Sequence, residues 1–346
     1  MAGYRLFFLA TGGLGLLAAP LAAQSPSYAV RRAIVVGGQG GWDYLAVDTA
    51  RNRLYVSHGN QVEVIDLARD TVIGVIPGTP GVHGIAIAYD LARGYASGGR
   101  DSSVTIFDLG TLAVIKRVNV GARSPDAIGY DPVSHRVFTF NGGSANATAI
   151  DGASGDVIGM IPLGGKPEFW AADGKGSMWV NNEDKDVLVQ FDTKALNVVK
   201  VVTLAGCRRP TGLGFDAKRG LLFPVCNLSA TILVVDGARG TVLATLPIGQ
   251  GVDGGGYDPG PGFAFASAGE GRLTIVGESL GAWKVLQDVP TLRGARTMVV
   301  DPRSHRIYLS TADYGVPPDS TAANPRPRAP VIPGSFKVLV VGPPAP

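Results

Sequence analysis

Hydrophobic residues in this chain occur in short runs that are broken by glycine, proline, aspartate or asparagine. A clear example is Gly129–Phe138, in which an apolar run meets an Asp-Pro turn and a basic residue then leads into an aromatic run. The same sequence pattern occurs at Val47–Tyr55, at Phe215–Phe223 and at Val300–Tyr308. Short apolar runs bounded by turn residues are typical of β-strands. The pattern therefore predicts strand–turn–strand units that repeat along the chain.

Two series of marker residues give the period of the repeat. The aromatic residues after the turn are Tyr55, Tyr95, Phe138, Trp179, Phe223, Phe265 and Tyr308, with spacings of 40, 43, 41, 44, 42 and 43. The residues that end a later strand of each copy are Asp66, Asp108, Asp151, Asp192, Asp236 and, in the sixth copy, Gly277. Two independent series with one period indicate seven copies of a single structural unit.

Each copy contains four short runs with strand character. In the first copy they are approximately Tyr44–Val47, Arg53–Val56, Gln61–Ile65 and Thr71–Ile76. Four strands in about 40–45 residues, repeated, are the signature of a propeller blade. We therefore predict an all-β fold, a seven-bladed β-propeller of four-stranded blades, in one domain over residues 24–346.

The seventh copy lacks an outer strand. It supplies only Thr297–Val300, Arg306–Leu309 and Lys337–Val341. An additional run near the N-terminus, Tyr28–Val36, resembles the fourth run of the other copies. We expect this N-terminal strand to complete the last blade, because that pairing closes the ring and removes two exposed strand edges.

One segment interrupts the period. Residues 312–334 are polar and rich in proline, and they lie between the second and third strands of the last blade. Loops of this length are either functional lids or disordered segments, and the sequence favours neither reading.

Composition supports this fold and narrows the range of functions. The 346 residues include 49 glycines and 24 prolines, which leaves little room for long helices. Charged residues make up 17% and the net charge is +3, without a basic stripe. This charge is too weak and dispersed for an electrostatic nucleic-acid binder.

The first residues have the pattern of a secretory signal peptide. Arg5 precedes a small, apolar run over Phe7–Leu21, and Leu21-Ala22-Ala23 fits a cleavage site before Gln24. We expect residues 1–23 to be removed and the mature protein to be periplasmic or secreted, monomeric, and without a transmembrane segment. The alternative is a membrane anchor, but the run is short and glycine-rich for a spanning helix.

One position per blade is predicted to lie at the mouth of the central channel. It is found five residues before the turn aspartate, on the face where the chain enters each innermost strand, which we call the top face. In six blades the residues at this position are Asp43, Asp126, Glu168, Thr211, Asp253 and Arg296. In blade two the turn is two residues shorter, and the matching residue is His83. The loops between second and third strands add His58, Arg100, Asn141, Asn181, Asn182, Asn227 and Glu270 to this face. The channel mouth is therefore the predicted ligand site.

The mouth residues include candidate ligands for a divalent metal ion. These candidates are Asp43, His58, His83, Asp126 and Glu168, which come from neighbouring blades. Carboxylates beside histidine can hold a metal or act as general acid and base. The alternative is that these residues bind no specific ligand. They would then be polar because a propeller mouth is exposed to solvent and because aspartate and asparagine favour loops. His135 and His305 each lie in a Ser-His-Arg turn on the opposite, bottom face, where we expect a structural role.

The two cysteines, Cys207 and Cys226, lie in two loops on the top face of the fifth blade. In an exported protein such a pair predicts a disulfide. A thiol metal site is the alternative, although the separation of 19 residues lacks the C-x-x-C spacing of redox or zinc motifs.

Several runs resemble the YVTN repeat of the YncE-like bacterial β-propellers. They are Arg53–Ser57, Val62–Asp66, Thr71–Pro77, Val104–Asp108 and Thr231–Asp236, and the run Pro333–Gly342 is similar to the end of exported members. The resemblance covers about Ser27 to Gly342 and implies a periplasmic or surface propeller; some members bind DNA or other partners. The fold is also similar to that of lactonases and redox propellers, but this chain has no haem-attachment C-x-x-C-H motif.

Two functions remain open at this point. The first is a binding or scaffold protein that engages a protein, peptide, glycan or small molecule through its top-face loops and channel mouth. The second is a metal-assisted lactonase, or a related hydrolase or lyase, in which a bound divalent ion polarises a carbonyl and a free carboxylate activates water. The acids and His83 favour the enzyme, and the lack of a complete, recognised ligand set argues against it.

Overall fold

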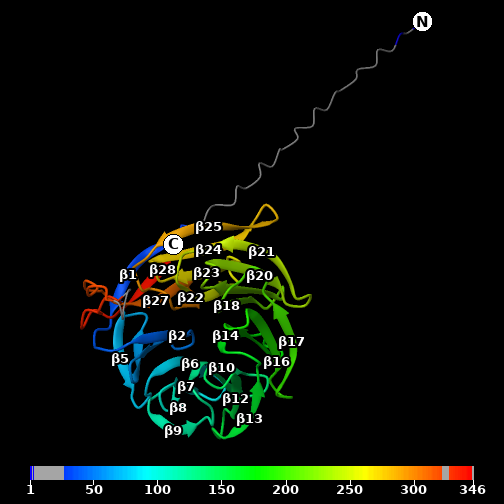
Figure 1. Cartoon of the computed structure of the whole chain (residues 1–346). Coiled ribbons are helices and arrows are strands. Elements are labelled where there is room, and N and C mark those ends of the chain that lie inside the picture. The colour runs from blue at the N-terminus through cyan, green and yellow to red at the C-terminus, as the bar shows by residue number, and fades with distance from the viewer. Residues whose placement is uncertain (2, 4–26, 322–326, 345–346) are drawn as a thin grey trace.

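The computed structural model describes residues 1, 3, 27–321 and 327–344. It is an all-β, seven-bladed propeller in which every blade is a four-stranded sheet (Figure 1). This confirms the predicted fold class. The predicted signal peptide depends on residues 4–23, which lie outside the described residues. In the part of the chain that the structure describes, no helix is long and apolar enough to cross a membrane.

The strands follow the repeat in order. Blades one to three contain β2 (Trp42–Asp48), β3 (Arg53–His58), β4 (Gln61–Asp66), β5 (Thr71–Ile76), β6 (Val82–Ala88), β7 (Arg93–Gly98), β8 (Ser103–Asp108), β9 (Val114–Asn119), β10 (Pro125–Asp131), β11 (Arg136–Asn141), β12 (Asn146–Asp151) and β13 (Val157–Pro162). Blades four to six contain β14 (Pro167–Ala172), β15 (Ser177–Asn182), β16 (Val187–Asp192), β17 (Asn197–Thr203), β18 (Pro210–Asp216), β19 (Leu221–Cys226), β20 (Thr231–Asp236), β21 (Thr241–Pro247), β22 (Val252–Asp258), β23 (Phe263–Ala268), β24 (Arg272–Ser279) and β25 (Ala282–Pro290). The last blade contains β26 (Met298–Asp301), β27 (Arg306–Thr311), β28 (Lys337–Gly342) and β1 (Ala29–Val35).

The hydrophobic pattern of a strand depends on its place in the blade. The four central residues of β4 are all buried, because neighbouring blades cover both faces of a middle strand. The outermost strand β21 instead alternates between exposed and partly buried positions, because one of its faces meets water. The core is thus a set of layers between blades, which explains why apolar runs, rather than strict alternation, dominate the sequence.

The aspartates that end a later strand of each copy, such as Asp66, accept hydrogen bonds from the backbone of the turn that follows. Asp66 Oδ1 accepts hydrogen bonds from the backbone N–H groups of Ala68 and Arg69, at 2.8 and 3.1 Å. This local bonding is the reason that aspartate favours such turns. In the sixth blade, where glycine replaces the aspartate, β24 and β25 continue to a two-residue turn at Leu280 and Gly281, both with positive φ.

The bottom turns repeat one left-handed backbone position. It lies four residues after the end of the innermost strand and is occupied by Asn52, Ala92, His135, Gly176, Gly220, Gly262 and His305, all with positive φ. His135 and His305 also reach neighbouring blades, where their Nδ1 atoms lie 2.9 Å from carboxylates of Asp90 and Asp258. Their place in the fold fits the structural role expected for the Ser-His-Arg turns.

The ring is closed by strands from the two ends of the chain. β1 pairs antiparallel with β28, and the sheet order of the last blade is β1-β28-β27-β26. This confirms the predicted closure. Tyr28 extends the closure to blade six, because its backbone N–H donates to Gln287 Oε1 at 3.0 Å and its carbonyl accepts from Gln287 Nε2 at 2.7 Å.

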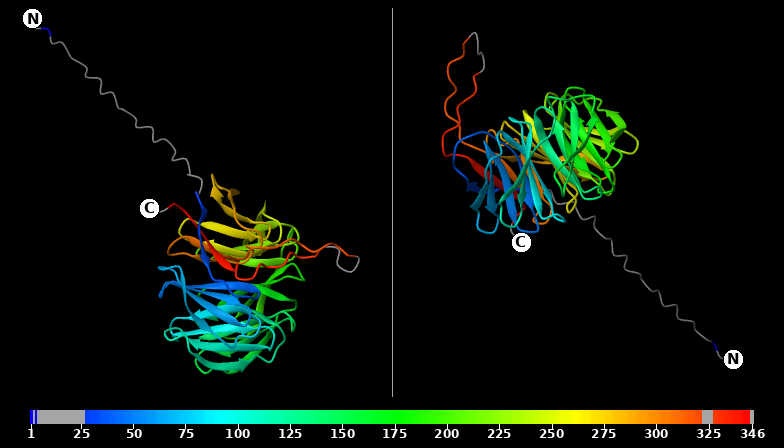
Figure 2. Two further views of the ribbon diagram at one scale, coloured as in Figure 1. Left: turned by 90° about the vertical axis from the view of Figure 1, so that its left-hand side faces the viewer. Right: turned by 90° about the horizontal axis from the view of Figure 1, so that it is seen from below.

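The proline-rich segment projects from the ring between β27 and β28 (Figure 2). Its described parts, residues 312–321 and 327–334, lie beside each other through a bridge between Tyr314 and Val331. The Gly315 N–H donates to the Pro330 carbonyl at 2.8 Å. We call these two described stretches the arm.

Candidate functional site

The channel mouth is built at a register shift that recurs at the start of the innermost strands. In blades one to six the pairing between the first and second strands shifts at Trp42/Leu45, Val82/Ile85, Pro125/Ile128, Pro167/Trp170, Pro210/Leu213 and Val252/Gly254. Bulges of this kind re-aim side chains and are common next to functional sites. In blade one the backbone N–H of Asp43 lies within the shift and donates a hydrogen bond to Ser57 Oγ at 2.8 Å. Each predicted mouth residue from Asp43 to Asp253 lies within such a shift.

Three of the predicted residues meet at the mouth. Asp43, His83 and Asp126 each place one possible metal-ligand atom within 4.8 Å of the other two. His83 Nδ1 lies 2.6 Å from Asp43 Oδ2 and 3.5 Å from Asp126 Oδ1. The imidazole therefore bridges two carboxylates that come from blades on either side of it. We call these three residues the mouth triad.

Two further carboxylates enlarge the negative charge around the triad. Glu168 accepts a hydrogen bond from the Tyr44 hydroxyl at 3.5 Å through Oε1, while its buried Oε2 has no hydrogen-bond partner among the described residues. Lys166 Nζ lies 3.8 Å from that oxygen. Asp253 pairs with Arg296, whose Nε is 3.0 Å from Asp253 Oδ2. Four carboxylates thus face a small number of cations.

Burial and mutual repulsion raise the pKa of these acids. Burial, with the nearby Asp43 charge, raises the pKa of Asp126 to about 7. Burial and the charge of Asp126 raise the pKa of Glu168 well above its usual range, and burial raises that of Asp253 to about 6. The pKa of His83 is also raised, because its hydrogen bond to Asp43 favours the imidazolium. Burial and mutual repulsion therefore favour the protonated forms of these acids, and a bound cation would oppose both effects.

An aromatic pair lies between the mouth and the channel below it. Tyr44 on β2 and Phe169 on β14 have ring centroids 5.2 Å apart. These strands belong to blades one and four and face each other across the centre of the ring (Figure 1). Below the pair, a cavity of about 350 Å³ is lined mainly by apolar residues of the innermost strands, among them Ala86, Ala127 and Val299. Tyr44 and Phe169 themselves line this cavity, and the Tyr44 hydroxyl also contacts Glu168 at the mouth.

Two predicted residues have other environments. Thr211 is buried, and its Oγ1 lies 3.5 Å from the Val225 carbonyl, so its hydroxyl turns toward its own blade. His58 is buried 3.1 Å from Glu63 Oε1, and its ring packs 4.5 Å from that of Phe336. The group of possible metal ligands found in the described residues does not include His58 or Glu168.

Residues beside the mouth position complete the charge pattern, and the sequence prediction missed them. Lys166 contacts Glu183 Oε1, and Arg209 Nε lies 3.1 Å from Glu183 Oε2. Lys166 and Arg209 each precede the mouth position of their blade by two residues. Applying the repeat at that offset as well would have identified both cations.

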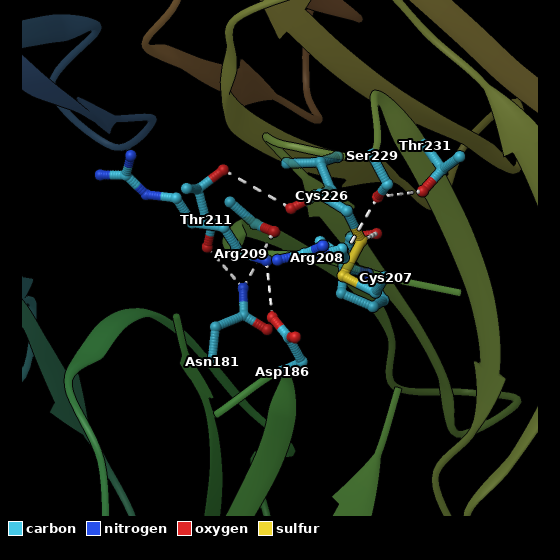
Figure 3. Close-up of a disulfide and its surroundings, with 12 residues drawn as sticks. Asn181, Asp186, Cys207, Arg208, Arg209, Thr211, Cys226, Ser229 and Thr231 are labelled. Atoms are coloured by element: carbon cyan, nitrogen blue, oxygen red, sulfur yellow. Dashed lines mark hydrogen bonds between the residues drawn. A yellow bond between two sulfur atoms is a disulfide. The ribbon is translucent and has the colours of Figure 1, made fainter. Parts of the chain in front are cut away.

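The cysteines form a disulfide in blade five, as predicted, with 5.3 Å between their Cα atoms (Figure 3). The bond links the loop before β18 to the end of β19. Arg209 lies in that loop and is also held by its backbone N–H, which donates to Asp186 Oδ1 at 2.7 Å. The disulfide therefore fixes one of the cations beside the mouth.

The fold and the site define a seven-bladed β-propeller with a charged mouth on one face. No protein-family model matches the sequence, and no curated protein matches it. Among solved structures, a chain of the hydrazine synthase of Kuenenia stuttgartiensis is similar with a TM-score of 0.68 at 16% identity, covering 78% of this chain and 92% of that chain. A chain in the crystal structure of a mitotic checkpoint complex gives a TM-score of 0.70 at 13% identity, covering 89% and 95%. At these identities the similarity shows the propeller fold alone.

Proposed function

We propose that this chain is a binding protein whose channel mouth holds a divalent cation and presents it to a ligand on the top face. The observation that carries the proposal is the convergence of Asp43, His83 and Asp126 within 4.8 Å of one another. The raised pKa of Asp126 supports it, because burial and the Asp43 charge disfavour the ionised carboxyl and a bound cation would stabilise it. The propeller fold is consistent with a binding or scaffold role.

The ligand types indicate which cations to expect. An imidazole with two carboxylates suits Zn²⁺ or Mn²⁺ better than Ca²⁺ or Mg²⁺, which prefer sets made only of oxygen. In the metal-free protein His83 Nδ1 is hydrogen-bonded to Asp43, whereas Asp126 Oδ1 has no hydrogen-bond partner among the described residues. A metal ion that binds His83 through Nδ1 would have to displace the proton between His83 and Asp43. Glu168 is not a member of the ligand group, and its buried Oε2 has no hydrogen-bond partner among the described residues.

Titration of chelator-stripped protein with Zn²⁺ and Mn²⁺ is expected to give one saturable site and a rise in Tm, because a ligand that binds only the folded state stabilises it. Asp126→Asn and Asp43→Asn are expected to weaken binding at least tenfold. Calorimetry and thermal melts measure both effects.

The matched control is Glu270→Gln, an exposed acid on the same face outside the mouth, which should bind the metals as the unaltered protein does. Equal binding by Asp126→Asn and the unaltered protein would contradict the proposed site. If neither Zn²⁺ nor Mn²⁺ binds at a saturable site, the proposed cation site is wrong.

A second candidate function is metal-assisted hydrolysis or lyase chemistry, with lactones as the substrate class. The observation in its favour is the raised pKa of Glu168, a carboxyl outside the mouth triad, since a general base works best with a pKa near the operating pH. Metal-loaded protein is then expected to open γ- and δ-lactones in a pH-stat assay. Glu168→Gln should abolish turnover while leaving metal binding nearly unchanged. If protein saturated with metal opens no lactone, the proposed enzymatic function is wrong and the binding function is retained.

Several observations support placing this protein among exported, YncE-like propellers. The repeat residues quoted above resemble that family, and the predicted signal peptide and mature domain, residues 24–346, follow its organisation. The Cys207–Cys226 disulfide fits an oxidising compartment, since such bonds persist mainly outside the cytosol.

A further inference from the structure

A second cavity lies on the top face, and Arg296, the mouth residue of the last blade, is part of its lining. Its volume is about 630 Å³, within the range of small-molecule sites. Its walls come from the segment that leads into β2, from the loops before β22 and β26, from the loop after β23, and from the arm. Trp42 and Tyr314 lie on the wall, and no function proposed above uses either residue.

The charge of this cavity is the reverse of that at the mouth. Its lining contains Arg293, Arg296 and Arg328 and no acidic residue. Arg296 is already paired with Asp253, at 3.0 Å. Neither Arg293 nor Arg328 has a carboxylate within ion-pair distance among the described residues. Two guanidinium groups in one concave site are therefore without an anionic partner.

The local backbone is adapted to hold the arm against the cavity. Gly294 has φ of +83°, and a Cβ there would meet the Tyr314 hydroxyl at 2.1 Å, so only glycine permits this contact. Arg293 lies over the Tyr314 ring, with 5.9 Å from the guanidinium carbon to the ring centroid. These contacts orient an arginine and an aromatic ring toward one space.

We propose that this cavity binds a sugar-sized organic anion, with its carboxylate or phosphate group between Arg293 and Arg328 and its body beside Trp42 and Tyr314. Guanidinium groups bind planar or tetrahedral oxyanions through paired hydrogen bonds, so the two arginines would hold the charged group of the ligand. Aromatic side chains offer flat apolar contact to the rest of such a molecule, which accounts for the tryptophan and tyrosine. The proposal does not depend on the metal site, because no member of the mouth triad lines this cavity.

The test is titration of the full mature chain with glucose 6-phosphate, gluconate, inorganic phosphate and neutral glucose. The readouts are calorimetry and tryptophan fluorescence, to which Trp42 contributes. We expect saturable binding of glucose 6-phosphate or gluconate with a Kd of about 1 mM or tighter, and no binding of glucose. Comparison of the phosphate and carboxylate probes identifies which oxyanion the site prefers.

Arg328→Ala and the double variant with Arg293→Ala are expected to weaken that binding at least tenfold. The matched control is Arg123→Ala, an exposed arginine on the top face of blade three, which should bind as before. A thermal melt of each variant separates loss of binding from loss of fold. No saturable binding of any charged probe up to about 10 mM, or equal binding by Arg328→Ala and the control, would overturn the proposal.

Discussion

A chain that lacks residues 27–36 is expected to lose most of its thermal stability. Without β1, the strand β28 becomes an exposed edge, and blade seven keeps only β26, β27 and β28. The deletion also removes the two hydrogen bonds between Tyr28 and Gln287 that join the last blade to the sixth. An open ring with an unpaired edge is also prone to pair with other chains. We expect a fall in Tm of more than about 15 °C, or aggregation, in a thermal melt followed by circular dichroism.

A pair of point substitutions tests the same closure in a chain that still folds. Ile34 is 1% exposed in β1, whereas its neighbour Val35 is 71% exposed on the other face of the strand. Ile34→Ala is expected to cost about 3 kcal/mol of unfolding free energy, and Val35→Ala less than about 0.5 kcal/mol. A synthetic peptide of residues 27–36 should raise the Tm of the truncated chain by adding the missing strand. A truncated protein that melts like the full one would contradict the closure.

Replacing Asp126 with asparagine is expected to stabilise the metal-free protein at about pH 8 while removing its response to metal. The pKa of Asp126 is raised from 3.8 to about 7, so above neutrality the folded state carries a buried charge that burial and Asp43 oppose. Asparagine has the same shape as the protonated acid and removes that charge. The expected gain is on the order of 2 kcal/mol, below the full value of the shift because protein sites relax around charges.

The pH dependence follows from the sign of the shift. Between 3.8 and about 7 the folded state holds a proton on Asp126 that the unfolded state has released. Stability of the unaltered protein therefore falls as the pH rises through this interval, and the advantage of Asp126→Asn grows with it. At about pH 4 the two proteins should have nearly equal stability. Chemical denaturation at four pH values, with Glu270→Gln as control, measures the difference in unfolding free energy. A difference that stays constant across pH would show that ionisation of Asp126 does not destabilise the folded state.

The repeat predicted the fold because the residues that define it make their contacts within a single blade. A turn aspartate, an aromatic residue and a second turn are each fixed by hydrogen bonds or packing within one blade, as the capped turn at Asp66 illustrates. The ring closure was predictable for a similar reason, since seven copies left one strand missing and Tyr28–Val36 supplied it. The mouth position was predictable because the register shift recurs at the same place in successive blades.

The orientation of individual mouth side chains was less predictable. The repeat places Thr211 at the mouth, but its hydroxyl contacts the Val225 carbonyl of its own blade. His58 was predicted beside the acids, but it is held by Glu63, five residues along the same hairpin. The contact between Tyr44 and Phe169 joins blades that are not neighbours, so it depends on the diameter of the ring. Such contacts arise from tertiary geometry, which a one-dimensional period does not contain.

The pairing of β1 with β28 also sets the order in which this protein can fold. The residues that it joins are as far apart as Arg31 and Gly342, 311 positions along the chain. Blades one to six form from contiguous sequence and can assemble as synthesis proceeds, but β1 emerges first and its partner emerges last. Closing a loop of that length is slow, so β1 stays unpaired until β28 has been synthesised. A chaperone that shields β1 during that interval would therefore increase the fraction of chains that reach the closed ring.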